Sequence, residues 1–232
     1  MNECMLCGGE TVFSLSASFI FSFKPFPASI KCHDCLSKLV LLKKHPTCPG
    51  CCRRQIDHSL CQDCIRWKRR YLTDSFNHLA LYAYNEPMKE WLEQYKFHGD
   101  IRQAHAFSEE IKQSLKPFIK EGYLFAPIPV DSDRLESRGF NQVEELLECA
   151  ELPYSCFLGR KAGGKKQSDK NRKERMETKQ PFYIKKEWQE NVQGKKIFLI
   201  DDVYTTGRTL FHAADVLKEA GASQIRTFTV AR

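Results

Sequence analysis

The number and spacing of the cysteines indicate a role in binding metal ions. Nine of the eleven cysteines fall within the first 64 residues, and eight of these form four pairs with two residues between the partners. Two thiolates at that spacing can bind one tetrahedral metal ion from a tight turn, and two pairs complete a closed site without an open coordination position. The sequence therefore predicts two structural zinc sites, with the ligands Cys4, Cys7, Cys32, Cys35, Cys48, Cys51, Cys61 and Cys64.

The pairing of these cysteines is left open by the sequence. Serial use of the pairs is the simplest arrangement, and a cross-braced arrangement is the alternative. Cys52 is an alternative ligand to Cys51, although the spacing favours Cys51. A redox or disulfide role is the other interpretation. We favour zinc because the sequence shows neither a signal-peptide pattern nor a membrane-spanning apolar run, which predicts a cytoplasmic protein with reduced thiols.

A second set of chemically capable residues follows the most apolar segment, 196–200. Asp201 and Asp202 can accept hydrogen bonds from a vicinal diol, such as the 2′- and 3′-hydroxyls of ribose. The residues after them offer hydroxyls and backbone N–H groups where a helix begins, which suits a phosphate. The sequence predicts a sugar-phosphate site here, and the alternative is a capped turn with incidental acids. The phosphate candidates are Thr205, Thr206, Gly207 and Thr209.

The elements that position these residues alternate between helices and short apolar strands. Apolar residues recur at helical spacing between Pro87 and Gly99, and again through Phe107, Ile111 and Leu115. This alternation predicts an α/β fold with a mainly parallel sheet, in which ligands bind at the carboxyl ends of strands. The predicted strands are 123–130, 156–158, 196–200 and 225–230.

Charge is unevenly distributed along a chain whose composition, 42% apolar and 28% charged, excludes a disordered or collagen-like protein. Segments 1–70 and 159–175 each carry a net +6, and the remainder carries −5. These two segments predict contacts with polyanions. Behind the last cysteine pair, basic residues interleave with an aromatic residue, which suits nucleic acid; the alternative is a solvated helix. These candidates are Arg66, Trp67, Lys68, Arg69 and Arg70.

The acid pair and the loop after it resemble the phosphoribosyl-pyrophosphate (PRPP) signature of type I phosphoribosyltransferases. Together with the runs 96–100, 127–129 and 138–142, they resemble the ComF family of competence proteins. The resemblance implies a type I phosphoribosyltransferase-like α/β fold, a mainly parallel sheet flanked by helices, behind a small double zinc-ribbon module. We expect the module to span 1–70 and the transferase-like domain to span 71–232.

The resemblance also implies roles for individual residues. Asp201 and Asp202 would contact the ribose, and the threonine and glycine loop would hold its 5′-phosphate. Arg138, with Gly139, would supply charge at the pyrophosphate. A mobile basic loop would close over the site through Lys165, Lys166, Arg172 and Arg175. Mg²⁺ would accompany PRPP if the site is active. No nucleophile–base pair is visible, so no catalytic residue is assigned.

The function implied by the resemblance is that of a competence factor in natural transformation, which helps to internalise single-stranded DNA. The implied partners are single-stranded DNA, a ComFA-like helicase or ATPase and DprA. We expect no membrane insertion, and recruitment to the inner face of the membrane through those partners. The alternatives are an active PRPP-dependent transferase and a non-catalytic scaffold or sensor.

Overall fold

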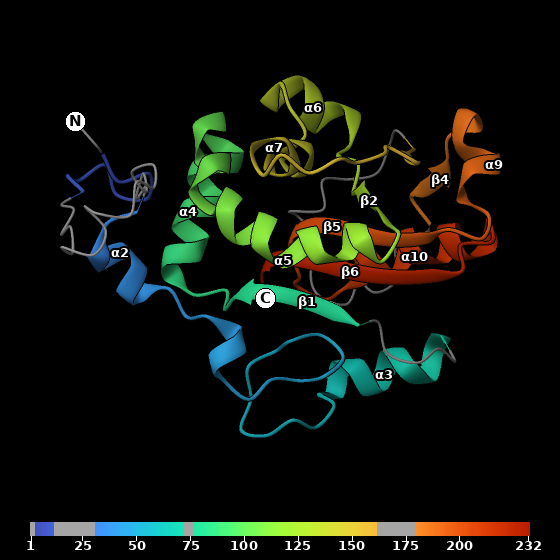
Figure 1. The fold of residues 1–232 in the computed structure, drawn as a ribbon, viewed down its shortest axis with the longest axis horizontal. Helices are drawn as coiled ribbons and strands as arrows, with labels where there is room; N and C mark the ends of the chain where they lie inside the picture. Colours follow the sequence, from blue (N-terminus) through green and yellow to red (C-terminus); the bar gives the residue numbers. More distant parts are fainter. Residues whose placement is uncertain (1–2, 12–30, 72–76, 162–179) are drawn as a thin grey trace.

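A four-stranded parallel sheet forms the centre of the molecule. The computed structural model describes residues 3–11, 31–71, 77–161 and 180–232 (Figure 1). The strands are arranged in the order β1-β6-β5-β2, and each neighbouring pair is parallel. The predicted α/β class with a parallel sheet is confirmed. The strands are β1 (His78–Tyr82), β2 (Tyr123–Pro127), β5 (Lys196–Val203) and β6 (Gln224–Ala231).

Helices cover both faces of this sheet because successive side chains of β5 point to opposite sides. Phe198 and Ile200 belong to the apolar cluster that α4 (Glu86–Phe97), α5 (Ser108–Lys120) and α7 (Gln142–Cys149) complete. Ile197 and Leu199 belong to a second cluster on the face of α10 (Arg208–Glu219). A strand that is buried on both faces explains the unbroken apolar run in its sequence.

Smaller elements fill the connections between these strands and helices. A short antiparallel pair joins β3 (Leu158–Arg160) to β4 (Phe182–Ile184) beside the main sheet. The remaining elements are α2 (His33–Lys38), η1 (Leu42–Lys44), α3 (Gln62–Tyr71), η2 (Ile101–Phe107), α6 (Ser132–Arg138), η4 (Lys186–Trp188) and α9 (Gln189–Val192).

The observed strands differ from the predicted ones mainly at their ends. β5 extends three residues beyond the apolar run, so both acids lie inside the strand instead of after it. β2 ends at Pro127, and β3 begins at Leu158, where the predicted strand ended. β1 was not predicted, because its five residues include a histidine and carry no clear alternation. That histidine, His78, is buried, and its ring nitrogens lie 2.8 and 3.2 Å from the hydroxyls of Thr227 and Thr229.

The cysteine-rich segments pack directly on the sheet. Val40 accepts a hydrogen bond from the N–H of Ala83 at 2.8 Å, just beyond β1. The buried Lys31 Nζ reaches the carbonyl of Ala106 and lies 2.6 Å from a carboxylate oxygen of Glu110. The division into 1–70 and 71–232 stays a prediction.

Among the helices of the described residues, none combines the length and the apolar character that crossing a membrane requires.

Candidate functional site

The acid pair lies at the carboxyl end of β5, on opposite faces of the strand. Asp202 is only 2% exposed, and its carboxylate lies 2.6 Å from the Nζ of Lys96, near the end of α4. Asp201 remains partly exposed, and its Oδ1 accepts a hydrogen bond from the N–H of Asp202 at 2.9 Å. Burial and the neighbouring Asp202 carboxylate raise the pKa of Asp201 to about 7, although the Lys96 charge opposes the shift. The more accessible of the two acids for a sugar hydroxyl is therefore Asp201.

A tight loop, 204–207, joins β5 to the start of α10. Gly207 has a φ of 79°, and a Cβ at this position would overlap the hydroxyl of Tyr204. Only glycine satisfies both requirements, because other residues are strained at positive φ and carry a Cβ. Thr205 is exposed, and Thr206 and Thr209 are partly exposed beside the positive end of the helix dipole. The loop therefore presents hydroxyls where a phosphate is favoured by the helix.

A second cation, Arg138, lies near the acids. Arg138, the last residue of α6, donates from Nε to the carbonyl of Lys96 at 3.0 Å and from Nη1 to Gln142. Burial lowers the pKa of Arg138, and the Asp202 carboxylate opposes that shift. Gly139 follows with a φ of 83° and ends the helix. Arg138 therefore lies close to the acid pair, and its role toward pyrophosphate stays a prediction.

Sequence reasoning assigned no role to Lys96, although Lys96 belongs to the run 96–100 that carries the family resemblance. Lys96 and Asp202 form an ion pair although more than a hundred residues separate them in the sequence. Helical periodicity does not indicate which strand lies beside the end of a helix, so this pair could not be predicted. The predicted mobile loop with Lys165, Lys166, Arg172 and Arg175 lies outside the described residues.

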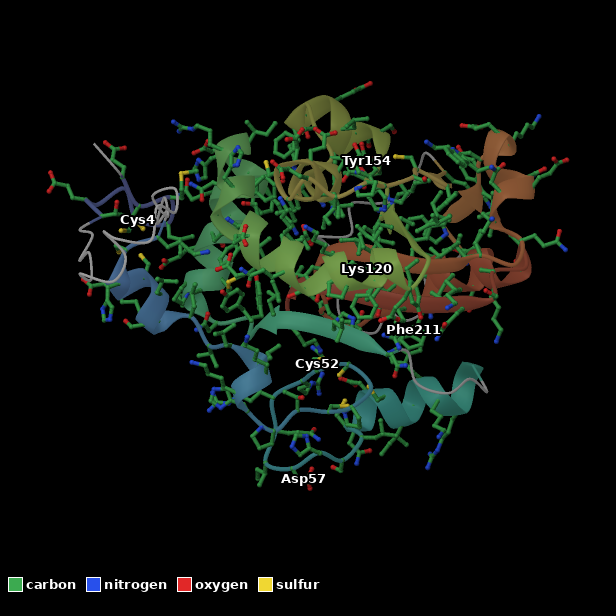
Figure 2. The ribbon with its side chains drawn as sticks, viewed as in Figure 1. Cys4, Cys52, Asp57, Lys120, Tyr154 and Phe211 are labelled. Atoms are coloured by element: carbon green, nitrogen blue, oxygen red, sulfur yellow. The ribbon has the colours of Figure 1, made fainter. Side chains whose placement is uncertain are left out.

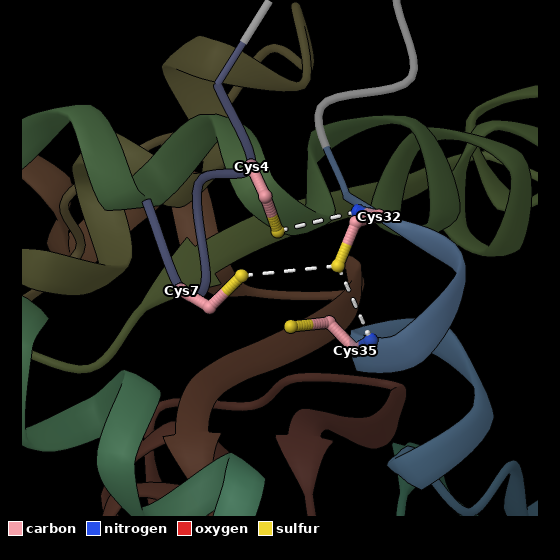
Figure 3. A group of neighbouring side chains, drawn as sticks. All are labelled: Cys4, Cys7, Cys32 and Cys35. Atoms are coloured by element: carbon pink, nitrogen blue, oxygen red, sulfur yellow. Dashed lines mark hydrogen bonds between the residues drawn. The ribbon is translucent and has the colours of Figure 1, made fainter. Parts of the chain in front are cut away.

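The eight paired cysteines form two groups in serial order. Figure 3 shows the first tetrad, in which the Sγ atoms of Cys7 and Cys32 are 3.8 Å apart. In the second tetrad the Sγ atoms of Cys51 and Cys61 are 3.7 Å apart. Tetrahedral zinc with Zn–S bonds of about 2.3 Å places its sulfurs about 3.8 Å apart, so these donor sets fit such an ion. The tetrads are Cys4, Cys7, Cys32 and Cys35, and Cys48, Cys51, Cys61 and Cys64.

The second tetrad is the more deeply buried of the two. All four of its thiols are buried, whereas Cys7 of the first tetrad is exposed. A hydrogen bond from Cys64 lowers the pKa of Cys51 to about 4 against the cost of burial, and the charge of Arg232 contributes. Cys52 does not belong to the second tetrad, because its Sγ contacts the carbonyl of His78 at 2.9 Å. The alternative ligand set with Cys52 is thereby removed.

The basic segment behind the last cysteine pair forms α3, and its aromatic residue is not available for stacking on bases. Trp67 is 3% exposed, and its ring stacks on Phe211 of α10 at 4.3 Å between centroids. The assignment of Trp67 as a nucleic-acid contact is therefore corrected. Arg66, Lys68 and Arg69 are exposed, and the side chain of Arg70 lies outside the described residues.

Comparison with known proteins gives matches to part of the chain and to nearly all of it. The phosphoribosyl transferase domain family matches residues 136–232, which include the acid pair, the loop and α10. The matched part holds β5 and β6 of the parallel sheet, and β1 and β2 precede it in the chain. A hypoxanthine phosphoribosyltransferase from Staphylococcus aureus is 15% identical, with a TM-score of 0.33, and the match covers 56% of this chain and 62% of that structure.

Two curated relatives match almost the full chain. Competence protein ComFC of Streptococcus pneumoniae (strain ATCC BAA-255 / R6) is 37% identical over 99% of this chain and 100% of its own length. Competence protein ComFC of Bacillus subtilis (strain 168) is 36% identical over 99% of this chain and 94% of its own length. The chain belongs to the ComFC family of competence proteins.

Proposed function

We propose that the chain acts in competence for natural transformation and binds a ribose 5-phosphate compound of the PRPP type at the carboxyl end of β5. The observation that carries the ligand class is the adjacency of Asp201 to the loop at 204–207, which only glycine at position 207 allows. The competence role is supported by relatives that share more than a third of their residues over nearly the full length.

Each group at the site has a distinct task in this proposal. The Asp201 carboxylate accepts hydrogen bonds from ribose hydroxyls, and the loop with the start of α10 holds the 5′-phosphate. Lys96 and Arg138 provide positive charge beside the acid pair, which offsets repulsion between the acids and an anionic ligand. Mg²⁺ bound together with PRPP supplies further positive charge for its pyrophosphate.

Replacing both acids, Asp201→Ala with Asp202→Ala, is expected to reduce PRPP binding in the presence of Mg²⁺ below detection by calorimetry. The reason is the loss of the acceptors for the ribose hydroxyls. A matched double variant, Glu187→Ala with Glu190→Ala, removes two exposed acids of η4 and α9 and should bind as the unchanged chain does. Unchanged PRPP affinity in the Asp201 and Asp202 variant would contradict the site.

The same variants separate ligand binding from the competence role. Transformation that falls together with PRPP binding supports a function that uses the site. Normal transformation without PRPP binding supports the scaffold alternative. Release of pyrophosphate from PRPP, measured with candidate base acceptors, tests whether the site also transfers the ribose phosphate.

We propose that zinc occupies both tetrads. Each tetrad consists of four thiols whose sulfurs lie within 4.8 Å of one another, and an all-sulfur donor set favours this ion. Metal analysis of the purified, reduced chain is expected to give two zinc ions per chain.

We propose that single-stranded DNA contacts the exposed basic residues of α3. Reversing two charges, Lys68→Glu with Arg69→Glu, is expected to weaken binding and to reduce the slope of log K against log salt by about 1.4, because two phosphate contacts are lost. The control reverses Lys43 and Lys44 in η1, which are equally exposed in the same module. Fluorescence anisotropy with an oligonucleotide at several salt concentrations measures both quantities, and equal slopes in the two variants would exclude α3.

We also propose that the chain binds a ComFA-like ATPase and DprA, and that these partners recruit it to the membrane. These proposals rest on family membership, and capture of each purified protein by the chain tests them.

A further inference from the structure

The second tetrad is connected to the phosphate loop by an arginine. The guanidinium of Arg232 donates from Nη2 to the Cys51 Sγ at 3.2 Å and from Nε to the Cys51 carbonyl at 3.0 Å. From Nη1 it donates to the carbonyls of Tyr204 and Thr205 at 3.2 and 3.3 Å. The same group lies over the ring of Tyr204 at 4.4 Å. One planar side chain therefore contacts a metal-ligand candidate and two successive peptide units of the loop.

A tryptophan makes a second connection, starting from another member of the tetrad. Cys64 and Trp67 are three residues apart on α3 and so lie on the same side of that helix. The indole Nε1 of Trp67 donates to the carbonyl of Thr206 at 2.9 Å. The ring of Trp67 stacks on Phe211 of α10, and Figure 2 shows Phe211 close to α3. The loop and the helix that follows it are thus both held against α3.

These two connections fix the direction of the loop's hydrogen-bond donors. Three successive carbonyls, those of residues 204, 205 and 206, accept hydrogen bonds from the side of the second tetrad. In a trans peptide unit the C=O of one residue and the N–H of the next point in opposite directions. The N–H groups of Thr205, Thr206 and Gly207 therefore point away from the tetrad. Successive N–H groups on one side of a loop form an anion-binding concavity.

Within the described residues, the first tetrad lies on the other side of the sheet from the second. Figure 1 shows its helix α2 beside α4, whereas α3 lies beyond β1. Met5 and Leu6, between Cys4 and Cys7, pack against the apolar cluster of α4, α5 and α7, on the other face of the sheet from α10. The two tetrads are therefore chemically alike and differ in what they support.

We propose that the metal-loaded second tetrad positions the phosphate loop through Arg232 and Trp67, so that binding of a ribose 5-phosphate ligand depends on this tetrad and not on the first. Arg232 and Trp67 are positioning residues, since they hold the backbone of the loop and leave ligand contact to its N–H groups. The inference deepens the proposed function and rests on it for the identity of the ligand.

Two conservative variants test the connections without altering a cysteine. Trp67→Phe keeps a ring to stack on Phe211 and removes the indole donor. Arg232→Lys keeps the charge and removes the planar fork. The first matched control is Trp91→Phe, which removes a 3.0 Å indole bond to the Gln103 carbonyl. The second is Arg226→Lys; Arg226 lies in β6, the strand that Arg232 follows, over the rings of Phe118 and Tyr123.

Amide hydrogen exchange of residues 205–210 and PRPP affinity are measured on each variant, and zinc content is measured in parallel. We expect exchange to become about tenfold faster and affinity to fall about tenfold in Trp67→Phe and Arg232→Lys, with two zinc ions retained. The controls should match the unchanged chain. In a further pair, Cys61→Ser should accelerate exchange of the loop, and Cys7→Ser should leave it unchanged.

The two readouts separate the inference from the proposed function. Loop exchange in Trp67→Phe and Arg232→Lys equal to that of the controls would overturn the inference, whatever Cys61→Ser does. If the unchanged chain fails to bind PRPP, the proposed ligand is wrong, and the exchange measurements still decide whether the tetrad positions the loop.

Discussion

Replacing Cys48 by serine should lower the melting temperature by more than about 10 °C, because it removes one ligand of the proposed zinc site, and a structural zinc ion contributes its binding free energy to folding. Cys48 is fully buried and belongs to the apolar cluster that contains Leu199 and Leu210. Loss of the metal leaves three buried thiols that no longer share an ion and frees the loop at 48–64 from its cross-link. The destabilisation therefore reaches the face of the sheet on which α10 packs.

The matched comparison is Cys7→Ser in the first tetrad. Cys7 is exposed, so losing that metal disturbs a more solvated region and should lower the melting temperature by less. Calorimetry under reducing conditions, with zinc measured on the same samples, gives both quantities. Equal shifts in the two variants would show that burial of the second tetrad adds nothing to its contribution.

Much of the site could be predicted from local sequence because its parts are close in the chain. The spacing of the cysteines indicated two tetrads, and two groups of four thiols that could each hold a metal ion are confirmed. The apolar run at 196–200 indicated a buried parallel strand, which is also confirmed. Such predictions succeed for residues within one turn or one strand, as in each cysteine pair, whereas the pairing between Cys7 and Cys32, 25 residues apart, was left open by the sequence.

The parts that sequence missed depend on side chains that meet across the fold. Trp67 looked like a base-stacking residue among arginines, yet its indole reaches the carbonyl of Thr206, 139 positions away. Arg232 and Cys51 are 181 positions apart. Neither composition nor periodicity indicates contacts between residues so far apart in the chain. The expected division into a cysteine module and a transferase-like domain therefore gave no sign that the two are in contact.

Replacing Lys96 by methionine should destabilise the chain by about 3 kcal/mol, because it leaves a buried carboxylate without its ion-pair partner. The Nζ of Lys96 lies 2.6 Å from Asp202, whose side chain is 3% exposed. Methionine keeps most of the apolar stem, so the change isolates the charge. The control on the same helix is Lys89→Met, which breaks an exposed, solvent-screened pair with Glu86 and should leave the free energy of unfolding almost unchanged.

The destabilisation by Lys96→Met should grow with pH. The pKa of Asp201 in the folded chain, about 7, lies above its ordinary value of 3.8, and Lys96 opposes that rise. A carboxyl with a raised pKa contributes stability that is present in full below pH 3.8 and is lost as the pH rises through 7. Without Lys96 the pKa of Asp201 rises further, so the stability contributed by its protonated form continues to be lost up to a higher pH. Urea unfolding at about pH 6 and about pH 8.5 should therefore show the larger difference from the unchanged chain at the higher pH. A difference that is the same at both pH values would mean that Lys96 stabilises the fold by packing alone.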